Sequence, residues 1–242
     1  MEKSEKGVNM KSRVQRMKNK LLSSYYGNPI KDMKLICVMG AQDAMPVARL
    51  THEILRTAGL SSAVLAADTP IKAGTLHKFL NEAWKAKNHY VIVTAPMESL
   101  ENNVFHGLPV HVAALTDAAE GMLAAADSLF AVPPAIVVLN HDDANYGAFE
   151  KYVGATDTYT YGRTTGSTVR IDNSKLYARG TEANLTFGNK VFTVASFLTG
   201  ELVVSQMAGA ATIATALHVA PAAIAEGIAN LESLEASDEV AG

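Results

Sequence analysis

The chain has 242 residues, 48% apolar residues and a formal net charge of −3 at pH 7. This composition is sufficient for the core of one large domain or two small ones, and the slight negative charge argues against general nucleic-acid binding. The single cysteine, Cys37, rules out a disulfide framework and is typical of a reducing cytosol, so we expect a cytoplasmic protein. No signal peptide is expected, because the N-terminus is charged. No transmembrane span is expected either, because the most apolar window, residues 122–139, is interrupted by Asp127 and Pro133-Pro134.

Residues 1–25 form a basic N-terminal extension. We expect residues 1–9, which are polar, to be disordered and residues 10–25 to form a helix. Four apolar residues fall on one face of this helix and five basic residues occupy much of the rest: Val14, Met17, Leu21 and Tyr25, and Lys11, Arg13, Arg16, Lys18 and Lys20. One interpretation is a solvated helix that docks its apolar stripe on the domain. The other is a helix that binds a membrane surface or an acidic partner.

Short apolar runs alternate with amphipathic segments between residues 34 and 139. The expected strands are 34–38, 63–67, 90–93, 110–115 and 135–139, and the expected helices are 46–58, 76–86 and 118–129. This alternation predicts βαβ units and a doubly wound α/β fold with a parallel sheet.

After Gly147 the pattern changes. Short runs separated by turn residues predict antiparallel strands at 156–161, 169–171, 176–178, 184–187 and 190–193. Two Ala-rich helices, at 203–217 and 221–231, are expected to form core, with a dimer interface as the alternative. The tail, residues 232–242, is acidic and is expected to be loose.

The stretch between the first strand and its helix has the position of a phosphate-binding loop. A strand, a turn at Gly40 and a helix that starts near Pro46 would offer free backbone N–H groups to an anion. A working P-loop also needs a lysine for the phosphates and a Ser or Thr for Mg²⁺, whereas residues 40–46 read Gly-Ala-Gln-Asp-Ala-Met-Pro. The loop therefore lacks the chemical groups of a P-loop, and Asp43 is expected to repel a phosphate.

Several motifs occur in a characteristic order: Tyr-Gly-Asn-Pro at 26–29, the strand and turn at 35–40, the segment 107–116, Asn-His-Asp-Asp at 140–143, Tyr-Gly at 161–162 and Leu-Thr-Gly at 198–200. Together they resemble the central, ATP-binding domain of the Mur ligase family, which makes peptidoglycan stem peptides and includes folylpolyglutamate synthetase. The resemblance covers residues 26–231. It implies a P-loop-NTPase-like, doubly wound, mostly parallel sheet with a small antiparallel β extension, preceded by the basic extension 1–25 and followed by the acidic tail 232–242.

The chain departs from the family at the positions that carry catalysis. Residues 44–45 are Ala-Met where the family has Lys and Thr, and Thr94 stands where the family has a Glu that holds Mg²⁺. Residues 116–117 are Thr-Asp where the family has Thr-Asn, and the position of the family's carbamylated lysine falls near Ala126. Acyl-phosphate chemistry depends on neutralising the γ-phosphate, so these departures imply loss of the activity, with no catalytic residues. ATP and Mg²⁺, the family's cofactors, are expected to bind weakly or not at all.

Residual nucleotide contacts are predicted at Gly40, Asn140, Asp142 and Asp143, because the family's NADD segment lies near the adenine and ribose. The alternative is a turn capped by local hydrogen bonds. Glu98 and Glu101 are either a carboxylate pair near the family's metal position or the solvated start of a helix. The seven histidines lack the spacing of a helical metal site, and only His141, within the turn, is of interest.

These observations favour a catalytically degenerate, Mur-ligase-like central domain that acts as a binding or scaffolding protein near cell-wall precursor metabolism, with a protein partner or a second copy of itself. One alternative is a subunit of an ATP-dependent acid–amino-acid ligase, completed by a partner chain. The other is a peripheral membrane adaptor that uses the basic helix, although a membrane surface is the less favoured partner.

Overall fold

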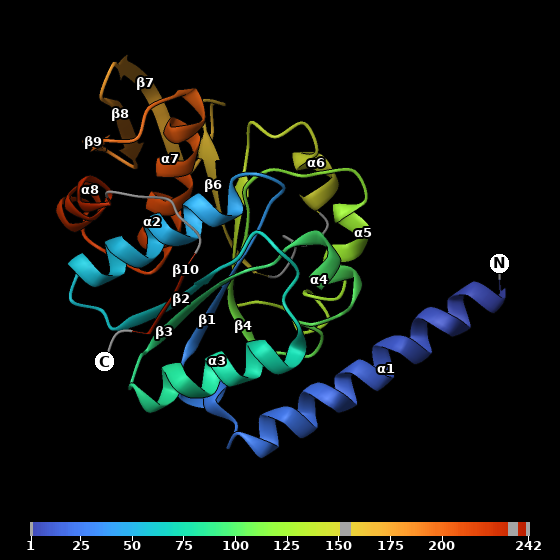
Figure 1. Cartoon of the computed structure of the whole chain (residues 1–242). Helices are drawn as coiled ribbons and strands as arrows, with labels where there is room; N and C mark the ends of the chain where they lie inside the picture. Colours follow the sequence, from blue (N-terminus) through green and yellow to red (C-terminus); the bar gives the residue numbers. More distant parts are fainter. Residues whose placement is uncertain (1, 151–155, 232–236, 241–242) are drawn as a thin grey trace.

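The computed structural model of the chain describes residues 2–150, 156–231 and 237–240. One sheet of ten strands runs through the molecule, with helices on both faces (Figure 1). The strands are β1 (Lys34–Met39), β2 (Ser62–Ala66), β3 (Tyr90–Thr94), β4 (Val110–Leu115), β5 (Ile136–Asn140), β6 (Asp157–Gly162), β7 (Val169–Tyr177), β8 (Gly180–Phe187), β9 (Lys190–Ser196) and β10 (Ser237–Val240). The helices are α1 (Glu2–Tyr25), the 3-10 helix η1 (Pro29–Asp32), α2 (Ala44–Thr57), α3 (Ala73–Lys85), α4 (Met97–Glu101), α5 (Met122–Ala126), α6 (Tyr146–Phe149), α7 (Glu201–Ala216) and α8 (Pro221–Asn230).

The spatial order of the strands is β10-β2-β3-β1-β4-β5-β6-β7-β8-β9. Pairing is parallel from β2 to β7, and β8, β9 and β10 pair antiparallel to their neighbours. The expected doubly wound, mostly parallel sheet with an antiparallel extension is therefore confirmed.

The central strand β1 is buried on both faces, as its continuous apolar run predicts. Ile36 and Val38 pack into a core with α2, α7 and α8, while Leu35, Cys37 and Met39 pack into a second core with η1 and α3 to α6. Burial raises the pKa of the Cys37 thiol far above its usual value, so this cysteine is an unreactive core residue.

Several expectations about the elements were wrong. The helix expected at 118–129 is reduced to the five residues of α5, because Gly121 has a left-handed φ of 81° and the chain turns there. The strand expected as antiparallel at 156–161 is β6, which pairs parallel to β5, and the runs at 169–171 and 176–178 belong to one continuous strand, β7. The pairing of β6 and the length of β7 depend on contacts between strands, which the local sequence pattern does not encode.

The two ends of the chain also differ from expectation. Residues 2–9 belong to helix α1, whereas we expected disorder. In the tail, residues 237–240 form β10 against β2, and the rest of the tail lies outside the described residues. None of the helices in the described part of the chain is long and apolar enough to cross a membrane.

Helix α7 is core, as expected, and α8 packs one face on the same core. Almost every residue of α7 from Val203 to Ala216 is buried, and α8 packs on α2. A Cβ on Gly227 of α8 would lie 2.5 Å from the Cα of Ile54 in α2, so the two helices approach as closely as their backbones allow.

The basic helix does not dock its apolar stripe on the domain. Val14, Met17, Leu21 and Tyr25 are all exposed, whereas Asn19 is only 3% exposed. The interpretation of α1 as a helix docked by its apolar face was therefore wrong.

Candidate functional site

Three loops from the carboxyl ends of adjacent parallel strands meet at one edge of the sheet. They follow β1, β4 and β5, whose order in the sheet is β1-β4-β5. Their backbones are joined directly, since Ala41 donates its N–H to the carbonyl of Asp117 at 3.2 Å and Asn140 Nδ2 donates to the carbonyl of Thr116 at 2.8 Å. This edge is where ligands bind in open α/β sheets.

The loop after β1 forms an anion-binding nest that holds a carboxylate of the protein itself. Asp117 Oδ2 accepts the backbone N–H groups of Ala41, at 3.1 Å, and of Gln42, at 2.9 Å, and Asp117 Oδ1 accepts that of Asp43, at 3.0 Å. The hydroxyl of Thr116 donates to the same carboxylate at 2.9 Å. Successive N–H groups that converge before a helix are the usual cradle for a phosphate, so Asp117 stands in the place of an anionic ligand.

Gly40 is required by this internal contact. A Cβ at position 40 would lie 2.0 Å from Thr116 Oγ1 and 2.5 Å from Asp117 Oδ1. The absence of a side chain therefore lets the loop after β4 approach the loop after β1. The predicted contact of Gly40 with a nucleotide remains a prediction.

Asp43 does not face the mouth of the loop, which corrects the role expected for it. It is 6% exposed, and its Oδ1 accepts a hydrogen bond from Gln206 Nε2 in α7 at 2.8 Å. Burial raises the pKa of the Asp43 carboxyl, the Gln206 hydrogen bond lowers it, and the nearby charge of Asp117 raises it further, with a net increase. The carboxylate that would repel a phosphate is that of Asp117.

Asn140 and Asp143 bind the neighbouring loop and their own turn. Besides the bond from Asn140 to Thr116, Asp143 Oδ2 accepts the N–H of Ala118 at 3.1 Å and Asp143 Oδ1 accepts the N–H of Asn145 at 2.8 Å. Only the bond from Asn145 is a local hydrogen bond of a capped turn, and the other two join the turn to the loop after β4. They leave the predicted nucleotide contact of these residues as a prediction.

Asp142 fastens the turn to the start of the segment between β6 and β7. Its N–H donates to Asn140 Oδ1 at 3.0 Å, and its carboxylate accepts the N–H groups of Arg163, at 2.6 Å, and Thr164, at 2.9 Å, together with the Thr164 hydroxyl at 2.7 Å. Burial opposes ionisation of Asp142, but these hydrogen bonds outweigh it and lower its pKa. Gly162 makes room for the carboxylate, since a Cβ there would lie 2.6 Å from Asp142 Cγ.

The other polar candidates have structural surroundings. His141 Nδ1 lies 3.1 Å from Ser167 Oγ, and its ring centroid is 4.5 Å from that of Tyr146. Glu98 and Glu101 are exposed residues of the short helix α4, in line with the interpretation as a solvated helix start. The described residues contain no cluster of three or more His, Cys, Asp or Glu side chains suited to a metal ion.

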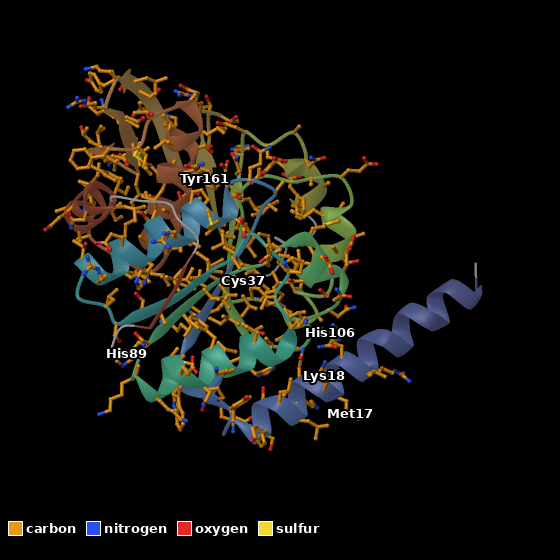
Figure 2. The ribbon with its side chains drawn as sticks, viewed as in Figure 1. Met17, Lys18, Cys37, His89, His106 and Tyr161 are labelled. Atoms are coloured by element: carbon orange, nitrogen blue, oxygen red, sulfur yellow. The ribbon has the colours of Figure 1, made fainter. Side chains whose placement is uncertain are left out.

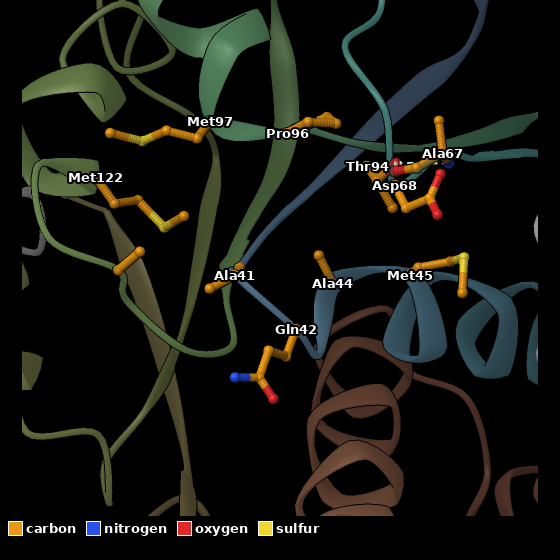
Figure 3. Close-up of a pocket in the computed structure, with 12 residues that line it drawn as sticks. Ala41, Gln42, Ala44, Met45, Ala67, Asp68, Thr94, Pro96, Met97 and Met122 are labelled. Atoms are coloured by element: carbon orange, nitrogen blue, oxygen red, sulfur yellow. Dashed lines mark hydrogen bonds between the residues drawn. The ribbon is translucent and has the colours of Figure 1, made fainter.

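A cavity of about 290 Å³ lies beside the loop, between the start of α2 and the ends of β2 and β3 (Figure 3). Figure 3 shows Met97 and Met122 on one side of it and Thr94, Ala67 and Asp68 on the other. Its lining is Gly40, Ala41, Gln42, Ala44, Met45, Ala67, Asp68, Thr94, Pro96, Met97, Ala119 and Met122. Asp68 is the one charged residue in this lining.

Thr94 stands where the family has the Glu that holds Mg²⁺. Its hydroxyl is hydrogen-bonded to the backbone of Ala67, directly after the neighbouring strand β2. Its Oγ1 accepts the N–H of Ala67 at 2.9 Å and donates to the carbonyl of Ala67 at 2.7 Å. A neutral hydroxyl used in this way is a poor substitute for a carboxylate ligand of Mg²⁺. The residues at this edge therefore do not fit Mg²⁺–ATP: the nest holds a carboxylate, and the cavity lining offers no cation for the phosphates.

Two curated sequences match most of the chain. A UDP-N-acetylmuramoyl-L-alanyl-D-glutamate–2,6-diaminopimelate ligase from Solibacter usitatus is 25% identical over 238 residues, covering 87% of this chain and 48% of the relative. A ligase of the same name from Bacillus licheniformis is 26% identical over 259 residues, covering 91% of this chain and 51% of the relative. The chain is related to the Mur ligases. No family model matches it, and it spans about half the length of these curated Mur ligases.

Solved structures agree on the fold. A 2,6-diaminopimelate ligase of the same name superposes with a TM-score of 0.80 at 19% identity, over 91% of this chain and 50% of the other. MurF from Acinetobacter baumannii gives a TM-score of 0.76 at 14% identity over 90% of this chain and 50% of the other. Folylpolyglutamate synthetase from Lactobacillus casei gives 0.68 at 14% identity over 88% of this chain and 66% of the other. The chain therefore has the fold of a Mur ligase central domain.

Two residues of the site were not assigned from the sequence. Asp117 was noted only as a departure from the family's Thr-Asn segment, and Gln206 was not singled out. The available signal for Asp117 was a carboxylate directly after a parallel strand, because the carboxyl ends of neighbouring parallel strands lie at one edge. No comparable signal exists for Gln206, which lies 163 positions from Asp43.

Proposed function

We propose that this Mur ligase relative does not carry out ATP-dependent ligation and acts as a binding or scaffolding protein of the cytoplasm, near peptidoglycan precursor metabolism. The link to peptidoglycan rests on the names of the related ligases. The observation that carries the loss of ligation is the Asp117 carboxylate, which accepts three backbone N–H groups of the loop after β1.

Electrostatics support this proposal. A phosphate in the loop would need the same N–H groups that Asp117 uses, and it would bring a second negative charge beside the carboxylate. Two unit charges about 4 Å apart repel each other by about 4 kcal/mol at an effective dielectric constant of about 20. Neither a P-loop lysine nor a metal-binding carboxylate is available at the matching positions to offset this repulsion, since these are Ala44 and Thr94.

Isothermal titration calorimetry of the full chain with ATP, ADP and adenosine, each with and without Mg²⁺, tests the proposal. We expect no Mg²⁺-dependent binding. Any residual binding would come from the turn at Asn140–Asp143, and it would be similar for the three ligands because that turn contacts no phosphate. An Asn140→Ala variant, compared with Asn145→Ala in the same segment, would locate such binding.

Micromolar, Mg²⁺-dependent binding of ATP would contradict the proposal. It would show that other residues have rebuilt the phosphate site, and the alternative of a ligase subunit completed by a partner chain would then be favoured. Co-purification of the tagged full chain from its native host would identify that partner.

A further inference from the structure

Helix α1 presents an exposed apolar stripe to solvent. The stripe consists of Val14, Met17, Leu21 and Tyr25, which are 63%, 66%, 67% and 81% exposed. Figure 2 shows Met17 on the side of α1 that faces away from the domain. Helical geometry, at about 100° per residue, places the four side chains within an arc of about 80°.

The opposite side of α1 is fixed to the domain. Asn19 Nδ2 donates to the carbonyls of Val104, at 3.1 Å, and His106, at 2.9 Å, and Gln15 Nε2 donates to Asn19 Oδ1 at 3.2 Å. Leu22 packs against the core beneath the helix. Because Asn19 lies on the far side of the helix from the stripe, α1 cannot turn the stripe inward without breaking the hydrogen bonds of Asn19 to Val104 and His106.

The width of the stripe favours a helix as its occupant. Positions 14, 17, 21 and 25 follow the spacing of three and four residues that gives a narrow two-helix seam. Helices that lie in a membrane interface present a broader apolar face, with Trp, Phe or Leu, and the stripe has neither Trp nor Phe.

The flanking charges define the chemistry of the partner. Arg13 and Lys20 lie along one side of the stripe and Lys18 along the other, all three are exposed, and residues 13–25 contain no Asp or Glu. A second copy of α1 would place these cations against cations, which is unfavourable at the flanks of a helix pair. We propose that the α1 stripe binds an amphipathic helix of another protein whose apolar seam is flanked by Asp and Glu.

This proposal rests on the scaffolding role proposed above and names the class of partner for it. It does not depend on the loop after β1. Its test uses the full chain and a fluorescein-labelled designed peptide with Leu and Ile at the seam and Glu at the flanking positions. A matched peptide carries Lys in place of Glu. Fluorescence anisotropy is expected to show saturable binding of the Glu peptide and none of the Lys peptide.

Two variants test whether binding occurs at the stripe. The double substitution Met17→Ser/Leu21→Ser is expected to weaken binding at least about tenfold, because it removes the centre of the seam. The matched control Leu176→Ser/Val191→Ser removes two exposed apolar residues of β7 and β9 and should leave binding unchanged. Circular dichroism verifies that both variants are folded.

Three results would overturn the proposal. One is absence of binding of the Glu peptide, or equal binding of both peptides. Another is binding to phosphatidylglycerol vesicles without binding to the Glu peptide, which would assign the stripe to a membrane. The third is dimerisation in sedimentation velocity that Met17→Ser/Leu21→Ser abolishes, which would assign it to a second copy. Mg²⁺-dependent ATP binding would bear only on the loss of ligation, so the two proposals fail separately.

Discussion

Replacing Asp117 by Ala removes the internal anion from the loop after β1. The N–H groups of Gln42 and Asp43 lose the carboxylate that accepts them. The Ala41 N–H keeps the backbone carbonyl of residue 117, and the Thr116 hydroxyl keeps the carbonyl of Met39. Hydrogen bonds to a charged group typically contribute about 1.5–3 kcal/mol each. The bonds from Ala41 and Gln42 are exposed, so water can replace the carboxylate there, and we expect a total loss of about 2–3 kcal/mol in the free energy of unfolding.

The same substitution should create a binding site for inorganic phosphate. Urea unfolding of Asp117→Ala is measured with and without phosphate, at matched ionic strength, beside wild type and Glu120→Ala. Glu120 is an exposed acid of the loop after β4, which also carries Asp117, so Glu120→Ala controls for the loss of one negative charge. Phosphate at 100 times its dissociation constant would stabilise Asp117→Ala by about 2.7 kcal/mol, and we expect no comparable gain for the other two proteins.

Two results would refute this reasoning in different ways. If Asp117→Ala unfolds at the same urea concentration as wild type, the carboxylate does not stabilise the loop. If the variant is destabilised but phosphate stabilises it no more than wild type, the carboxylate holds the loop but does not occupy a phosphate site.

Three further predictions concern stability. His77 is fully buried, and burial lowers its pKa from 6.5 to about 4, so only the unfolded chain takes up a proton between these pH values. The free energy of unfolding should therefore fall by up to about 3 kcal/mol as the pH decreases from 6.5 to about 4. In urea titrations, His77→Leu should remove that part of the pH dependence. Gly227→Ala should lower the free energy of unfolding by about 1–3 kcal/mol, because its Cβ meets the backbone of Ile54, whereas Gly74→Ala adds a methyl group in open space and should cause no loss; equal midpoints in thermal unfolding would contradict the close helix contact. Asn19→Ala should speed amide hydrogen exchange in α1 at least about tenfold with little change in the rest of the domain, because the two hydrogen bonds of the Asn19 side chain to Val104 and His106 hold the helix. Unchanged exchange would show that other contacts suffice.

The sequence by itself determined the parallel half of the fold. Continuous apolar runs such as Leu35–Val38 and Ile136–Leu139 have no polar face, so they can be satisfied only as strands covered on both sides. It also determined what the loop after β1 lacks, since the absence of a lysine or hydroxyl at 44–45 is a matter of residue identity. The boundaries of β7 and the parallel pairing of β6 were not determined, because the short polar runs after Gly147 are compatible with several registers.

Only the tertiary structure decided what fills the loop and which way α1 faces. The Asp117 carboxylate reaches the N–H groups of residues 41–43 across 74 to 76 positions of sequence, and Asn19 finds its carbonyl partners 85 and 87 positions further along the chain. Hydrophobicity alone predicts that the apolar stripe of α1 is buried against the domain or against a partner. The buried amide of Asn19 instead fixes the other side of the helix, because a buried amide needs hydrogen-bond partners and the carbonyls of Val104 and His106 supply them.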